Sequence, residues 1–124
     1  MNSAKPIRLV SHDGYVEVEM SGFLEVGSES YFSELSSLVQ LGGDSVGLLY
    51  SMSDVEGYAR EVAMAHAQRF RELLPTLTGI AVVSTTGVVR IGITFVAMLS
   101  GAKMKGFDGR EEAVAWLKSL TEDS

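Results

Sequence analysis

Residues 88–99 have the sequence VVRIGITFVAML, and the fold depends on which secondary structure this stretch adopts. Its apolar and β-branched residues alternate as in a strand, yet they also cover nearly every side of a helix. Short segments expected to form strands flank it at residues 80–83 and 103–107. Because two parallel strands need about a dozen residues between them, the sequence predicts a crossover helix over residues 88–99.

The first 20 residues predict a hairpin. Residues 7–10 and 15–20 are expected to pair as antiparallel strands, with an Asp-Gly turn at residues 13–14. Alternation along the second strand places Glu17 and Glu19 on a solvated face. The opposite face, which is expected to join the core, carries Val16, Val18 and Met20.

Helical spacing of apolar residues predicts further helices over residues 28–41 and 58–74. A buried central strand is expected at residues 46–50, followed by a loop at residues 51–57. An Asp-x-x-Glu cap at residues 108–111 is expected to start a terminal helix. The predicted fold class is therefore α/β, in the order ββαβαβαβα, with a mixed, largely parallel five-stranded sheet and about four helices.

Composition limits the classes of function. The chain has 124 residues, which suits one domain, and its net charge of -6 disfavours binding to nucleic acid. It has no cysteine and two histidines, so we expect no disulfide and no metal site. The apolar stretch at residues 88–99 is shorter than the ~20 residues that cross a bilayer, and no secretory signal is evident at the start of the chain. We therefore expect no transmembrane segment and a cytoplasmic location.

Neither histidine is expected to be catalytic. His66 lies in the apolar stripe of the helix predicted at residues 58–74, where a histidine is usually a hydrogen-bonded core residue, and His12 lies near the predicted turn. A serine hydrolase needs a nucleophile, a base and an orienting group that converge, and the sequence does not indicate such a set. We predict no catalytic, cofactor-binding or metal-binding residues and no enzymatic activity.

Ligands of α/β sheets usually bind beyond the carboxyl ends of the strands. In this chain that rule indicates residues 51–57 and 84–87. Ser53 and Glu56 have the spacing of a capping box for the following helix. Alternatively, Ser51 and Ser53 could form an anion-binding corner with the start of that helix.

The helix predicted at residues 88–99 carries more apolar surface than one side of a sheet can cover. The surplus is expected at Val88, Ile91, Phe95, Met98 and Leu99. A symmetric homodimer would cover it, and so would an apolar small molecule held between helix and sheet. In the second case the adaptable wall residues would be Met64, Met98 and Met104. A third possibility is that the helix lies wholly within the core.

Three stretches resemble those of a known family: VEGY at residues 55–58, IAVVS at residues 80–84 and FDGREEAVAWL at residues 107–117. With the order of elements, they make the chain similar to the STAS-like superfamily. These are small bacterial proteins related in fold to the sporulation anti-sigma-factor antagonists, and this chain most resembles their uncharacterised branch. The resemblance implies one STAS-like domain over residues 1–124, a binding or regulatory role with a protein partner, and no established chemistry.

The same resemblance implies a site of phosphorylation. Anti-sigma-factor antagonists carry an Asp-Ser-Ser-Gly-like stretch at the start of the helix after the central strand, and a partner kinase phosphorylates a serine in it. The corresponding residues here are SMSD at positions 51–54, so the motif differs although two serines are present. Ser51 or Ser53 is then the phospho-acceptor, and the added negative charge would release a partner.

Overall fold

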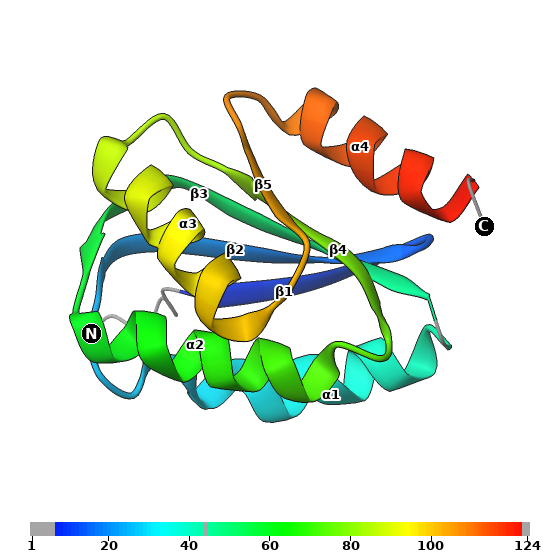
Figure 1. Ribbon diagram of the computed structural model, residues 1–124, viewed down its shortest axis with the longest axis horizontal. Helices are drawn as coiled ribbons and strands as arrows, with labels where there is room; N and C mark the ends of the chain where they lie inside the picture. The colour runs from blue at the N-terminus through cyan, green and yellow to red at the C-terminus, as the bar shows by residue number, and fades with distance from the viewer. Residues whose placement is uncertain (1–6, 44, 123–124) are drawn as a thin grey trace.

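Five strands form one mixed sheet in the computed structural model, which describes residues 7–43 and 45–122 (Figure 1). Their order across the sheet follows the order along the chain, β1-β2-β3-β4-β5. Strand β1 is antiparallel to β2, and the remaining neighbours are parallel, as predicted. The strands are β1 (Ile7–His12), β2 (Tyr15–Leu24), β3 (Val46–Tyr58), β4 (Leu77–Val83) and β5 (Met104–Phe107).

Four α-helices cover the two faces of this sheet. Helices α1, α2 and α3 lie against one face and α4 lies against the other (Figure 1). The predicted crossover helix is confirmed as α3. The helical elements are η1 (Ser28–Tyr31, a 3-10 turn), α1 (Phe32–Leu41), α2 (Arg60–Leu73), α3 (Gly87–Ser100) and α4 (Arg110–Glu122).

Successive side chains of each strand point to opposite faces of the sheet, so the core consists of two separate clusters. Val16, Val18 and Met20 join the larger cluster beneath α1, α2 and α3, as the sequence predicts. On the opposite face, Leu49 and Ala81 pack with α4 in a smaller cluster. The sheet is therefore buried on both faces along β4 and along residues 46–50 of β3, which explains why these stretches are apolar at nearly every position.

Residues 51–57 form a strand, so the predicted loop is wrong. Strand β3 continues to Tyr58 because β2 continues beside it to Leu24, and Gly22 pairs with Val55 across a register shift. Helix α2 begins only at Arg60, after the extended residue Ala59. The many polar residues of this segment indicated a loop, but a neighbouring strand satisfies its backbone instead.

Both predicted capping boxes are also wrong. Ser53 and Glu56 lie within β3, so they cannot cap α2. Asp108 lies two residues before α4 and accepts a hydrogen bond from Arg90 Nη2 instead. At the start of α4, the amide of Ala113 donates to the carbonyl of Gly109.

Helix α3 approaches the end of β3 very closely at Gly92. A Cβ atom added at Gly92 would lie 2.4 Å from the hydroxyl oxygen of Tyr58, well inside van der Waals contact. Tyr58 donates a hydrogen bond from this hydroxyl to the carbonyl of Val88, at 3.2 Å. The absence of a side chain at position 92 therefore sets the distance between α3 and the sheet.

Replacing Gly92 with alanine should lower the free energy of unfolding by up to ~2 kcal/mol, because the new methyl group must displace the Tyr58 ring and its hydrogen bond to Val88, which outweighs the gain of ~1 kcal/mol in helix propensity. The matched control is Gly87→Ala, at the start of the same helix, where an added Cβ meets nothing within 4 Å. That control should leave stability unchanged or raise it slightly, since alanine favours helix more than glycine does. Urea unfolding of both variants measures this, and equal effects would contradict the close approach.

Candidate functional site

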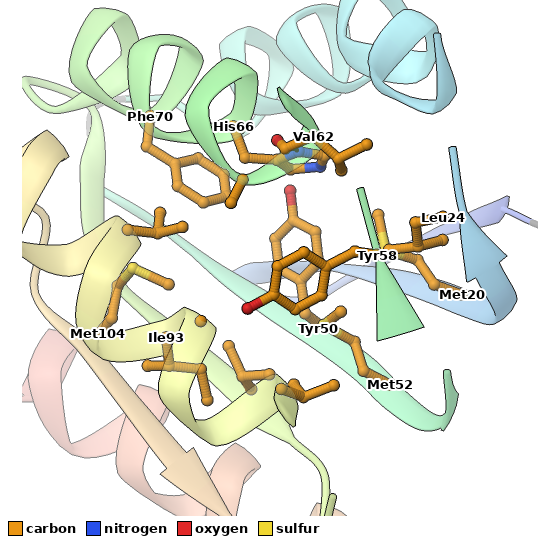
Figure 2. A pocket seen from close by; sticks show the side chains of 15 residues that line it. Met20, Leu24, Tyr50, Met52, Tyr58, Val62, His66, Phe70, Ile93 and Met104 are labelled. Carbon is orange, nitrogen blue, oxygen red and sulfur yellow. Dashed lines mark hydrogen bonds between the residues drawn. The ribbon is translucent and has the colours of Figure 1, made fainter. Parts of the chain in front are cut away.

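A pocket lies between α3, α2 and the sheet, with a volume of about 70 Å³ (Figure 2). Every helix and strand around it contributes apolar atoms, and the extension of β2 and β3 forms one wall. The lining residues are Met20, Leu24, Tyr50, Met52 and Tyr58 from β2 and β3, Val62, Ala63, His66 and Phe70 from α2, Val89, Gly92, Ile93 and Val96 from α3, and Val82 and Met104 from β4 and β5.

The polar atoms around this pocket bond to one another rather than facing into it. His66 Nδ1 donates to the carbonyl of Val62 at 2.8 Å, which leaves Nε2 to accept from the hydroxyl of Tyr31 at 3.0 Å in the neutral imidazole. The hydroxyl oxygen of Tyr31 in turn lies 2.6 Å from the hydroxyl oxygen of Tyr50. Burial raises the pKa of Tyr50 well above its usual range, while the hydrogen bond with Tyr31 acts against this rise. The prediction that His66 is a hydrogen-bonded core residue is confirmed.

An empty pocket of this size lowers stability. Lining atoms that face unfilled space lose van der Waals contacts, so a slightly larger side chain can be accommodated there. Val82 and Val83 are neighbours on β4, but Val82 lines the pocket whereas Val83 packs in the cluster beneath α4.

Val82→Ile should leave the free energy of unfolding unchanged or raise it by up to ~1 kcal/mol, because the added methylene fills empty space. Val83→Ile adds the same group to a packed cluster and should lower the free energy by about 1–3 kcal/mol. Thermal and urea unfolding of the two variants compare them directly. If Val82→Ile were the more destabilising of the two, the pocket would not be empty space.

The side of α3 that faces away from the pocket is apolar and exposed. We call it the outer face of α3; Ile91 is 72% exposed, Met98 is 79% exposed and Phe95 is 40% exposed. The five residues of this outer face are the predicted surface residues Val88, Ile91, Phe95, Met98 and Leu99. They are brought together along one side of one helix, and their role as a binding surface stays a prediction.

The prediction that Met64, Met98 and Met104 line a site for an apolar ligand is only partly right. Met104 lines the pocket, whereas Met64 and Met98 are exposed on the outside of α2 and α3. Arg90, the one charged residue of α3, bonds to the carbonyl of Ser84 at 2.8 Å and to Asp108. Its charge is thus engaged beside β5, away from the outer face.

A polar cluster on the other face of the sheet was not predicted. Glu17 is only 4% exposed, so its expected place on a solvated face is wrong. Its Oε1 accepts from Arg110 Nη2 and from His12 Nε2, each at 2.8 Å. Its Oε2 accepts from Ser51 Oγ at 2.8 Å and from Arg110 Nε at 3.1 Å. Arg110 begins α4, so this carboxylate ties β1, β2, β3 and α4 together.

These donors keep Glu17 ionised. The pKa of Glu17 is lowered to about 2, first by hydrogen bonds from Arg110 and then by those from Ser51 and His12, while burial opposes the shift. The reference value for a free glutamate is 4.5. Because the pKa is lower in the folded state, the carboxylate stabilises the fold above about pH 4.5, and this stabilisation is lost as the pH falls towards 2.

Glu17→Gln should therefore lower the free energy of unfolding at pH 7, by on the order of 2 kcal/mol, and the difference from the unmodified chain should vanish near pH 2. Urea unfolding between pH 7 and pH 2 measures it. Glu19→Gln is the control, because Glu19 forms an exposed ion pair with Arg8 at 3.0 Å, for which we expect less than ~1 kcal/mol. A pH-independent difference for Glu17→Gln would contradict the role of the carboxylate.

Neither of the two candidate phospho-acceptors, Ser51 and Ser53, lies at the start of a helix. Ser51 donates to Glu17 and Ser53 is exposed, and both lie within β3. The residue that precedes α2 is Ala59, so the phosphate-binding geometry of a helix N-terminus is not built at either serine. Phosphorylation of Ser51 or Ser53 stays a prediction.

Comparison with known families identifies the chain. The model of the SpoIIAA-like family matches residues 15–118. This range includes strands β2 to β5 and most of α4. The chain belongs to the SpoIIAA-like family. The resemblance to STAS-like proteins that the sequence indicates is thereby confirmed, and no curated protein matches the sequence.

Two solved structures share the fold of this SpoIIAA-like chain. One is an uncharacterised protein with a SpoIIAA-like fold from Shewanella loihica, with 16% identity and a TM-score of 0.68, covering 94% of this chain and 98% of its own. The other is an anti-sigma factor antagonist from Mycobacterium paratuberculosis, with 18% identity and a TM-score of 0.67, covering 90% of this chain and 92% of its own. At these identities the likeness establishes the fold. Among the described residues, no helix is long and apolar enough to span a membrane.

Proposed function

We propose that this chain is a non-enzymatic regulatory domain of the bacterial cytoplasm that acts as a homodimer through the outer face of α3. The domain comprises residues 1–124. The observation that carries the proposal is the exposure of the five apolar side chains of that outer face on one helix. Contiguous apolar surface of this kind is typical of sites where proteins associate.

The distribution of charge leaves the outer face of α3 as a place where a second copy of the chain can dock. Each copy carries a net charge of -6, so most surfaces of two copies repel each other. The outer face of α3 carries no charged residue, and Arg90 of the same helix is bonded to Asp108 away from that face. A two-fold axis through this face would bury apolar atoms on both copies without placing like charges opposite one another.

The arrangement of the serines and histidines supports a role without catalysis. Residues 43–47 (GDSVG) match the Gly-x-Ser-x-Gly spacing of a nucleophile elbow, but Ser45 precedes β3, whereas an elbow serine follows a strand and begins a helix. Ser51 donates to Glu17 rather than to a histidine, and His66 is bonded to Val62 and Tyr31. Family membership supports regulation through a protein partner, the role named for the mycobacterial structure.

Sedimentation velocity at micromolar concentration tests the homodimer. We expect the unmodified chain to sediment as a dimer and Ile91→Glu to sediment as a folded monomer, because the new charge would be buried against its own copy. Phe95→Glu should have the same effect. Val26→Glu, at an exposed apolar residue in the turn after β2, should remain dimeric. A monomeric unmodified chain, or dissociation by Val26→Glu alone, would refute the proposal.

A further inference from the structure

We propose that the pocket beneath α3 is a binding site for the end of an unbranched alkyl chain. The pocket lies on the inner side of α3 and none of its lining residues belongs to the outer face, so binding of a chain end in the pocket does not require the homodimer. Three features of the described residues support it: the chemistry of the lining, the volume of the pocket and the position of its opening.

The chemistry of the lining selects an apolar ligand. Tyr50, Tyr58 and His66 are the polar side chains that line the pocket, and each is bonded elsewhere: to Tyr31, to the carbonyl of Val88, and to both Tyr31 and the carbonyl of Val62. A buried water needs two to four polar partners, which this lining does not offer. Hydrocarbon is therefore a better occupant than water or a polar group.

The volume selects a chain rather than a ring. The pocket holds about 70 Å³, whereas an engineered apolar cavity that binds benzene holds about 150 Å³. A six-membered ring does not fit without displacing the walls. The terminal carbons of an alkyl chain are narrower and can enter, provided that the rest of the molecule has a way out.

The opening supplies that way out. Most lining residues are buried, but Met52 and Tyr58 at one end of the pocket and Ile93 and Met104 at the other are partly exposed (Figure 2). Ile93 and Met104 also line a shallow groove between α3 and β5, in which the longer part of a chain would lie; Met98 of the outer face lines the same groove. Methionine side chains are flexible, so Met104 can adjust to a ligand that enters beside it.

Titration with 1-hexanol and cyclohexanol tests the proposal, since the two probes have the same number of carbons and the same hydroxyl group. The readout is the methyl NMR spectrum, with Val62, Val82 and Val96 reporting on the pocket and Leu49 and Val83 on the opposite cluster. We expect saturable shifts at the pocket methyls with 1-hexanol and an affinity at least tenfold weaker for cyclohexanol. Equal affinities, or no saturable shift with 1-hexanol, would overturn the proposal.

Filling the pocket should block the probe. Ala63→Leu adds three carbon atoms to the lining and should abolish saturable binding of 1-hexanol, and Val82→Ile is the milder variant, with an expected loss of several-fold. Val83→Ile, on the other face of β4, should bind as the unmodified chain does. Undiminished binding by a folded Ala63→Leu or Val82→Ile variant would overturn the proposal.

The variant Ile91→Glu separates this proposal from the homodimer. Ile91 is exposed on α3 and does not line the pocket, so the variant should bind 1-hexanol with unchanged affinity whatever its oligomeric state. If 1-hexanol binding were lost together with the dimer, the ligand would lie between two copies and the pocket assignment would be wrong.

Discussion

The close approach of α3 to Tyr58 at Gly92 determines how the apolar surface of this protein is distributed. The absence of a side chain at Gly92 on the inner side of α3 allows the Tyr58 ring to lie against the helix, and its hydroxyl is satisfied by the carbonyl of Val88. Once this spacing is set, the inner side of the helix faces the pocket and the bulky residues of the outer face remain in solvent. The two proposed functions therefore depend on opposite sides of one helix.

A ligand whose affinity differs between monomer and dimer would shift self-association by the same factor.

The opposite face of the sheet is held by a different kind of interaction. Helix α4 covers β3 and β4 with apolar side chains, and at its first residue Arg110 reaches over β2 to Glu17. A buried carboxylate left without its partner would be strongly unfavourable, so the position of α4 and the ionisation of Glu17 depend on each other. His12 and Ser51 complete the set of donors and connect the hairpin and the central strand to the same carboxylate.

The sequence predicts the order of elements, the helix at α3 and the residues of its outer face, because these follow from periodicity over about a dozen residues. It does not predict the strand at residues 51–58, since that strand depends on pairing with residues 19–24, far away in the chain. Nor does it predict the burial of Glu17. Alternation shows which face a side chain occupies, but not that Arg110, 93 residues later, will cover it. The pocket exists because the small residues Gly92 and Ala63 leave space between α3, α2 and the sheet. No local sequence pattern encodes how side chains from distant segments fill such a space.

Cysteine cross-linking tests the central claim, self-association through the outer face of α3, most directly, because the natural chain contains no cysteine. Cysteines are placed one at a time at Ile91, Phe95 and Met98, and each variant is oxidised gently at micromolar concentration. Near a two-fold axis, equivalent residues of two copies come within disulfide distance. The account predicts a covalent dimer for at least one of these positions and none for a cysteine at Val26. Cross-linking at Val26 with none along α3 would contradict it.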